Sequence, residues 1–208
     1  MFRKFEIKGN RAHIRVYEEL TEIDKLAADE AFKKYKKMIL DEYLVSKGFI
    51  KYKTNGYVRK NKIDILEYID LQKERHGSKT FTVNYALMPL YVPHDYMVIG
   101  FGDRIGIAIS NRDIWWDYAN ESIAKISFQN VVEAIDKFVL PWFEKYSNEK
   151  KLIKKLLEDK KKKERKGLGV TYKNKEWLES LERCEDRSSI ISGNIEKLKL
   201  PQKLLGEI

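Results

Sequence analysis

Hydrophobic residues recur along the chain with two different periods, and these periods predict where helices and strands lie. Between residues 21 and 48, apolar side chains recur every three or four positions among charged ones, which is typical of an amphipathic helix. Thr21 and Asp24 have the spacing of a capping box at its start, and Gly48 ends it. Its buried face is predicted to consist of Ala28, Phe32, Tyr35, Ile39 and Tyr43. A second helix is predicted from Ile123 to Tyr146, and Pro141 is expected to kink or restart it.

Between these two helices the pattern changes to short apolar runs typical of strands. Four strands are predicted at Phe49–Lys53, Tyr57–Lys60, Ile63–Lys73 and Thr80–Met88. In the last of these, Phe81 and Val83 share one face and Asn84 lies on the other, which predicts a half-buried strand. The alternation of Arg104–Ser110 predicts a fifth strand beside it, and a short strand or hairpin is expected around Gly9-Asn10. The connections are short, which favours antiparallel pairing.

These elements predict an α+β fold. We expect an antiparallel β-sheet packed against the long N-terminal helix and the Ile123–Tyr146 helix, followed by a charged helical extension. Residues 1–149 are predicted to form the α+β domain, and residues 150–208 the extension.

Charge is unevenly distributed along the chain. The net charge is +9, yet residues 150–166 alone hold ten Lys or Arg against three acidic residues. Hydrophobic residues make up 43% of the sequence, which predicts a packed core. Cys184 is the single cysteine, and no apolar run has the length of a secretory signal or a membrane span, so we expect a cytoplasmic protein.

The lysine-rich segment is a candidate for binding nucleic acid through charge alone. Its candidate contacts are Lys160, Lys161, Lys162, Lys163, Arg165 and Lys166. The alternative is an amphipathic helix with a solvated lysine face and a contact side formed by Leu152, Ile153, Leu156 and Leu157. It is favoured because the segment has no aromatic residue on which a base would stack.

A second candidate site combines polar and aromatic residues from the predicted strands. Its members are Asn84, Arg104, Asp113, Trp115 and Trp116. A guanidinium between aromatic walls is a plausible receptor for an anion or carboxylate. The alternative is an internal Arg-Asp ion pair with the tryptophans buried in the core, and we favour it because large aromatic residues usually serve packing.

Other motifs give weaker signals. "GFGDRIG" has a late third glycine and a strand pattern where a dinucleotide site requires a helix, so no nucleotide cofactor is expected. The histidines His13, His76 and His94 lack the spacing of metal ligands, so no metal site is expected either. His94 precedes Asp95 and is expected to lie in a solvated surface loop.

Four short motifs give the chain a resemblance to a known family. They are Phe81-Thr82-x-Asn84, Arg104-Ile105-Gly106, Asp113-x-Trp115-Trp116 and Leu140-Pro141-Trp142. In their order and spacing the chain resembles the bacterial domain-of-unknown-function family 4304, over approximately residues 26–157. The resemblance implies a helix, antiparallel strands and a second helix, and it implies no established activity.

We therefore expect a non-enzymatic binding protein of the bacterial cytosol with a protein partner, of an immunity-type or defence-associated class by analogy. Two alternatives stay open. One is nucleic-acid binding through Lys150–Lys166, and the other is an enzyme that uses Arg104, Asn84, Asp113 and His94 on a small anionic substrate.

Overall fold

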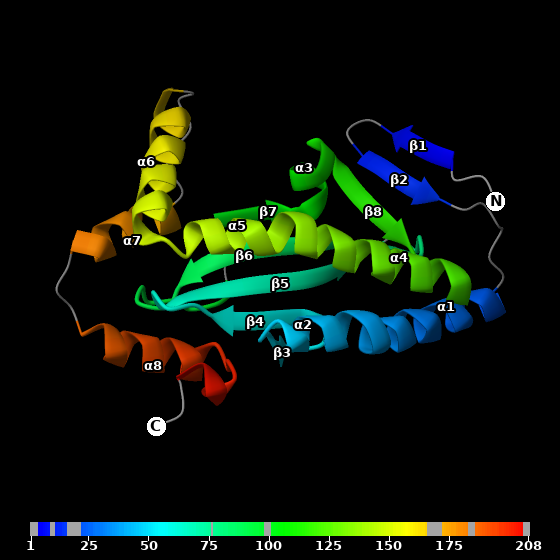
Figure 1. Cartoon of the computed structure of the whole chain (residues 1–208), viewed down its shortest axis with the longest axis horizontal. Coiled ribbons are helices and arrows are strands. Elements are labelled where there is room, and N and C mark those ends of the chain that lie inside the picture. Colours follow the sequence, from blue (N-terminus) through cyan, green and yellow to red (C-terminus); the bar gives the residue numbers. More distant parts are fainter. Residues whose placement is uncertain are drawn as a thin grey trace. The chain divides into compact units, whose positions relative to one another are not determined.

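The computed structural model describes residues 4–8, 11–15, 22–75, 77–97, 101–165, 172–182 and 186–205 (Figure 1). The fold is α+β, as predicted. Two compact units can be distinguished. Unit 1 comprises residues 1–57, 69–85 and 103–140, and unit 2 comprises residues 58–68, 86–102 and 141–208. The predicted boundary between residues 149 and 150 falls inside unit 2 and stays a prediction about folding units.

The strands pair in the order β1-β2-β8-β6-β5-β4-β3, and β7 also pairs with β6. Their bounds are β1 Lys4–Lys8, β2 Arg11–Arg15, β3 Ile50–Tyr52, β4 Gly56–Lys60, β5 Ile65–Lys73, β6 Thr80–Pro89, β7 Phe101–Arg104 and β8 Asp113–Asp117. The four strands predicted between residues 49 and 88 are confirmed to within two residues at each end. β1 and β2 pair antiparallel, which confirms the strands expected on either side of residues 9 and 10. The antiparallel prediction fails at one pair, because β2 and β8 run parallel.

The N-terminal helix forms where predicted, but its buried face is shifted by one residue. It runs as α1 (Glu22–Tyr35), a π-helical turn η1 (Lys36–Asp41) and α2 (Glu42–Ser46). After Tyr35 the fully buried apolar residues are Leu40 and Leu44, one position later than the predicted Ile39 and Tyr43. A π turn adds a residue to the helical repeat, so every later side chain is rotated. Gly48, with φ +83°, follows the helix as expected. Thr21 lies outside the described residues.

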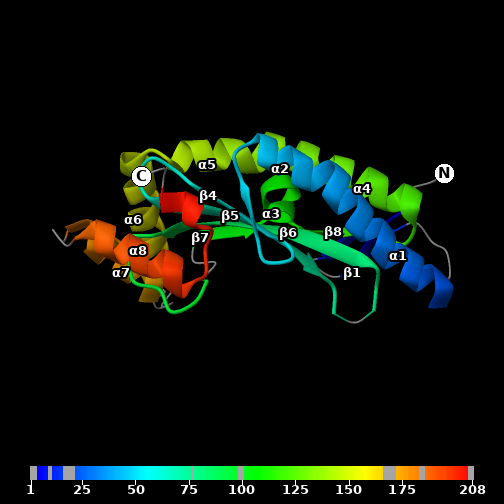
Figure 2. The same cartoon turned by 90° about the horizontal axis from the view of Figure 1, so that it is seen from below.

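The core of unit 1 is an aromatic cluster between the helices and the sheet. The Phe32 ring from α1 lies 5.2 Å from that of Phe81 on β6, and the Phe81 ring stacks 5.0 Å from Phe128 of α4 (Glu121–Ala134). Tyr118 closes the cluster, 4.8 Å from Phe32. In Figure 2, α1 and α4 lie on the same side of β6 and β8. This confirms the predicted packing of both helices on the sheet.

The second predicted helix also contains a π turn. It runs as α4, η2 (Ile135–Val139) and α5 (Leu140–Tyr146). Pro141 has no N–H to donate to the preceding turn, and the wider π turn lies where that hydrogen bond is missing.

The strand predicted at Arg104–Ser110 is wrong beyond its first residue. β7 ends at Arg104, and Ile105–Ser110 forms the short helix α3. In this helix Ile105 is fully buried, whereas Ile107 and Ile109 are partly exposed. The helix ends at Asn111, which adopts a left-handed conformation with φ +55°. The isoleucines at 105, 107 and 109 alternate with the period of a strand, so local spacing did not predict this helix.

The half-buried character predicted for Thr80–Met88 is also wrong. All ten residues of β6 are buried. The strand lies between β8 and β5 in the sheet, and both of its faces are covered. Asn84 is 8% exposed, so the predicted polar face is a buried polar face.

Unit 2 contains the C-terminal helices. Their bounds are α6 Glu149–Arg165, α7 Tyr172–Glu182, α8 Arg187–Lys197 and the 3-10 helix η3 Gln202–Leu205. Trp177 of α7 is buried and donates from Nε1 to the hydroxyl of Tyr91 at 2.9 Å. In the parts of the chain that the structure describes, every helix is too short or too polar to cross a lipid bilayer.

His94 is not the solvated loop residue that its sequence context predicts. It is 4% exposed, and its Nε2 lies 2.8 Å from the carbonyl oxygen of Pro89. Asn194 of α8 holds the same loop: its Oδ1 accepts from the His94 amide at 2.9 Å, and its Nδ2 donates to the carbonyls of Leu90 and Val92 at 2.7 Å. No local sequence pattern marks this clamp, because the partners are about one hundred residues apart.

Candidate functional site

The structure brings four of the five predicted site residues together in unit 1: Arg104, Asp113, Asn84 and Trp115. Arg104 at the end of β7 donates from Nη1 to the Asp113 carboxylate at the start of β8. Its Nη2 lies 3.4 Å from Oε1 of Gln72, which also accepts from Asn84 Nδ2 at 3.3 Å. Asn84 Nδ2 lies 3.5 Å from the Asp70 carboxylate as well. Arg104, Asp113, Asn84, Gln72 and Asp70 thus form one hydrogen-bonded group, which we call the sheet cluster.

The two adjacent tryptophans point to opposite faces of β8. Trp115 lies on the face of the sheet cluster, where the Arg104 guanidinium sits 5.3 Å from its ring centre. Trp116 pairs with Phe81 in the β6–β8 register and lies 6.2 Å from the Phe81 ring on the helix side. Successive side chains of a strand alternate between faces. Trp115 therefore belongs to the predicted site, and Trp116 belongs to the core.

Gly106 explains why α3 and β8 fit together. A Cβ at this position would lie 2.4 Å from both the Arg112 carbonyl oxygen and the Ile114 nitrogen. Any larger residue would push α3 away from the first residues of β8. The Arg104-Ile105-Gly106 and Asp113-x-Trp115-Trp116 motifs therefore build one corner: Gly106 allows the close approach, and the Arg104–Asp113 ion pair closes it.

The electrostatics of the sheet cluster fit the internal ion pair better than an anion receptor. The Arg104 charge is balanced by Asp113, and Asp70 adds a second carboxylate, so the cluster carries no excess positive charge. Trp115 Nε1 and Thr82 Oγ1 are buried on this face and find no hydrogen-bond partner among the described residues. A bound water is the common partner for such groups. Ligand binding by the sheet cluster stays a prediction.

The sequence analysis missed three buried carboxylates of the described residues, namely Asp41, Glu67 and Asp117. Asp41 in η1 is 5% exposed, accepts a hydrogen bond from Tyr57 and forms ion pairs with Lys36 and Lys51. Burial alone would raise the pKa of Asp41, but the bonds from Lys51 and Tyr57 and the Lys36 charge hold it below its usual value. The π turn rotates Asp41 inward, and no local pattern marks such a turn.

Glu67 of β5, in unit 2, is the second buried carboxylate. It is 3% exposed and accepts from Arg59 Nε at 2.6 Å. Burial raises the pKa of Glu67 despite the Arg59 charge. The sequence signal that could have identified Glu67 was its position as a charged residue inside an apolar run predicted to be a strand. Within unit 2, this carboxylate is paired with Arg59.

No cluster of three or more His, Cys, Asp or Glu side chains suited to a metal ion occurs in the described ranges. His94, which the enzyme alternative requires, belongs to unit 2, whereas Arg104, Asn84 and Asp113 belong to unit 1.

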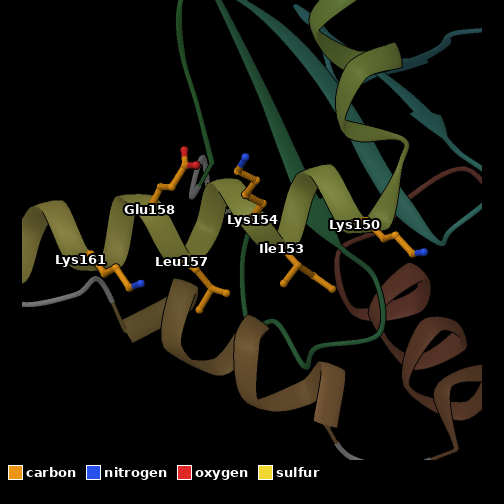
Figure 3. Close-up of a pocket in the computed structure, with 6 residues that line it drawn as sticks. All are labelled: Lys150, Ile153, Lys154, Leu157, Glu158 and Lys161. Atoms are coloured by element: carbon orange, nitrogen blue, oxygen red, sulfur yellow. The ribbon is translucent and has the colours of Figure 1, made fainter.

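The other candidate site lies on α6. A hollow of about 470 Å³ follows one side of this helix, and all of its described lining residues come from α6 (Figure 3). They are Lys150, Ile153, Lys154, Leu157, Glu158 and Lys161, which we call the α6 stripe. In Figure 3, Ile153 and Leu157 lie along the edge of the stripe nearer α7, whereas Lys154 and Glu158 lie along its other edge. The stripe thus has an aliphatic flank and a charged flank.

The α6 helix divides its apolar residues between two roles. Leu152 and Leu156 are fully buried, as the sequence predicts for its contact side. Ile153 is only partly buried, and Leu157 is 42% exposed although it was predicted on the same contact side. Single exposed aliphatic side chains are common on protein surfaces, so Leu157 marks a candidate contact only together with Ile153 and the charged residues beside it.

The charged residues of the α6 stripe pair neither with one another nor with other residues that the structure describes. Lys155 and Asp159 pair with each other at 2.5 Å beside the stripe. Lys150, Lys154, Glu158 and Lys161 form no ion pair with another described residue. The stripe therefore presents three positive charges and one negative charge beside two aliphatic side chains.

The predicted nucleic-acid contacts lie toward the end of the same helix. Lys161 and Lys162 are exposed, and Lys160 is partly exposed. Lys163 and Arg165 are within α6, but their side chains, like all of Lys166, lie outside the described residues. Nucleic-acid binding by this segment stays a prediction.

Comparison with known proteins gives a family for the chain. The model of the family described as "Domain of unknown function (DUF4304)" matches residues 40–145. The chain belongs to this family. The match contains Asn84, the Arg104–Asp113 corner and Leu140-Pro141-Trp142, which confirms the resemblance seen in the sequence. No curated protein and no solved structure matches the chain.

The extent of the DUF4304 match separates the two candidate sites. The sheet cluster and its corner lie within residues 40–145, the part of the chain that the family model matches. The α6 stripe lies beyond residue 145 and belongs to the part of this chain that the family model does not match.

Proposed function

We propose that this DUF4304 protein is a non-enzymatic binding protein of the bacterial cytosol, and that the α6 stripe contacts its protein partner. The observation that carries the proposal is the composition of the hollow. It combines exposed Leu157 and part-buried Ile153 with lysines that pair with no other described residue. Protein interfaces combine an apolar centre with a polar rim in this way.

The aliphatic flank favours a protein over a nucleic acid. A phosphate backbone offers charge to Lys150, Lys154 and Lys161, but it offers nothing apolar to cover Leu157. Glu158 within the stripe would also repel phosphate. A protein segment can present apolar and acidic side chains together, so it matches both flanks.

The sheet cluster supports the non-enzymatic part of the proposal. Arg104 is hydrogen-bonded to Asp113 and Gln72, so its guanidinium links strands. It is not positioned to contact a substrate. An immunity-type or defence-associated role is the more specific form of the proposal, with a toxin or nuclease as the partner. It predicts that the gene for such a protein lies beside the gene for this chain.

The test places a photo-crosslinking amino acid at position 157 in cells of the native host. The control places it at position 126 in α4, because Leu157 and Ile126 are both 42% exposed. We expect a polypeptide adduct of one recurring mass at position 157 and none at position 126. Equal adducts at both positions, or none at either, would contradict the proposal.

The nucleic-acid alternative has its own outcome. It predicts a gel shift that weakens steeply with salt and disappears when Lys160 to Lys163 are reversed to glutamate. Under the protein-binding proposal, Leu157→Glu abolishes partner binding and Ile126→Glu preserves it. A nucleic-acid shift that survives Leu157→Glu and fails on the lysine reversal would favour the alternative.

A further inference from the structure

The charged residues of the α6 stripe follow a fixed order along the helix. From its N-terminal end the charges are positive at Lys150 and Lys154, negative at Glu158 and positive at Lys161. With a rise of about 1.5 Å per residue, consecutive charges are about 6, 6 and 4.5 Å apart along the axis. The two aliphatic residues, Ile153 and Leu157, lie beside this row one helical turn apart.

Resting on the proposed function, we infer that the partner binds through an acidic amphipathic helix with a complementary charge order. Its docking face carries negative charges opposite Lys150, Lys154 and Lys161, a positive charge opposite Glu158, and an apolar side chain over Ile153 and Leu157. Opposite charges across an interface fix register and exclude wrong partners.

A helix suits this surface better than an extended segment. The α6 stripe is formed by side chains of one helix and offers no strand edge, so an extended peptide would gain no backbone hydrogen bonds from it. A helix satisfies its own backbone and repeats its side chains with the same rise as α6. Its charged side chains therefore remain opposite those of the α6 stripe over three helical turns.

A second copy of this chain is a poorer occupant. In an antiparallel pair of α6 helices, Lys154 faces Glu158 twice, but Lys150 faces Lys161 twice. In a parallel pair each charge faces its own kind. Neither arrangement gives net attraction, and the excess of ten basic over three acidic residues in residues 150–166 adds repulsion.

The first test uses synthetic helical peptides and the full-length chain. The register peptide carries Glu, Glu, Lys and Glu at positions i, i+4, i+8 and i+11, with Leu at i+3 and i+7. It is made in both chain directions. A scrambled peptide of the same composition carries its charges on the opposite face. By fluorescence anisotropy we expect one register peptide to bind about tenfold more tightly than the scrambled peptide. Equal affinities would overturn the inference.

The second test reverses the charge of the α6 stripe at position 158. Glu158→Lys makes the chain more positive, so attraction by net charge alone predicts tighter binding of every acidic peptide. A matched register predicts the reverse: the register peptide binds about threefold or more weakly, and replacing its Lys by Glu restores affinity. Tighter binding of the unmodified register peptide to Glu158→Lys would refute the inference.

Glu133→Lys supplies the matched control. It makes the same change of net charge at an exposed position on α4. We expect it to leave the ratio of register to scrambled peptide unchanged. A dimer that forms at micromolar concentration and is lost in Leu157→Glu, detected by sedimentation, would identify a second copy as the occupant and would also overturn the inference.

The two proposals fail differently. A specific adduct at position 157 together with peptides that bind alike would reject the acidic helix and leave protein binding by α6 intact. Absence of the adduct would reject protein binding by α6, whatever the peptides do.

Discussion

The Arg104 guanidinium donates a hydrogen bond to the Asp113 carboxylate, and the two residues flank helix α3 on either side. The same guanidinium lies over Trp115 and reaches Gln72 at 3.4 Å. One side chain thus joins the end of β7, the start of β8 and strand β5. We expect this link to stabilise the corner of the DUF4304 domain rather than to serve a reaction.

Replacing Arg104 with Lys tests this link. Lysine keeps the charge but loses the planar fork and the stacking on Trp115, so unfolding free energy should fall by about 1–2 kcal/mol. Arg112→Lys is the control, because Arg112 is exposed in the same connection and should change stability by less than about 0.5 kcal/mol. Urea titration followed by tryptophan fluorescence measures both. Equal effects would show that Arg104 contributes through its charge alone.

Gly106→Ala should destabilise unit 1 by about 2 kcal/mol or more, because the added Cβ would lie 2.4 Å from the backbone of Arg112 and Ile114. Gly193→Ala provides the contrast. Gly193 is exposed in α8, and a Cβ added there would meet no atom within 4 Å, so alanine should stabilise that helix by about 0.5–1 kcal/mol. Thermal unfolding of the two variants measures whether Gly106→Ala lowers stability and Gly193→Ala raises it.

Asp41 should contribute stability that depends on pH. Its pKa in the folded protein lies below its usual value, so its contribution is complete above the unfolded pKa of about 4 and is lost as pH falls through the folded pKa. Asp41→Asn should therefore cost about 1–3 kcal/mol at pH 7 and progressively less below pH 4. Urea titrations across this range measure the difference, and a constant difference would contradict the assigned role.

Glu67 should show the opposite slope. Its pKa in the folded protein is raised, so ionisation opposes folding increasingly as pH rises from the unfolded pKa of about 4 through the folded pKa. Gln can still accept the hydrogen bond from Arg59. The stability of Glu67→Gln relative to the natural protein should therefore improve between pH 4 and pH 7. A relative stability that falls over this range would contradict the raised pKa.

Asn194→Ala should release the loop that carries His94. The change leaves the Leu90 and Val92 carbonyls and the His94 amide without their partner, at a cost of about 2–4 kcal/mol. Hydrogen exchange at the His94 amide should become faster. Ser192→Ala, on the exposed side of the same helix, should leave that exchange rate unchanged. Unchanged exchange in Asn194→Ala would show that the clamp is not needed to hold the loop.

Elements with a long, regular pattern were predicted well. Both amphipathic helices and the four strands between residues 49 and 88 repeat their period often enough to identify the structure from local sequence. The sheet cluster was partly predictable for the same reason: alternation along β6 places Asn84 on the face opposite Phe81 and Val83. No strand was predicted at Asp113–Asp117, so alternation along β8 was not used to place Trp115 and Trp116 on opposite faces.

Short-range spacing was enough to establish the α+β class, the two long helices, the central strands and the family motifs. The remaining features depended on contacts between distant segments. The isoleucines of 105–110 alternate with the period of a strand, yet this segment forms a helix in which Gly106 closely approaches Arg112 and Ile114. A π turn moves burial from Ile39 to Leu40, and α8 buries His94 from about one hundred residues away. Leu156 is buried and the adjacent Leu157 is exposed. Neighbouring residues of a helix point about 100° apart, and no local pattern predicts which side another segment covers. This difference therefore depends on what packs against α6.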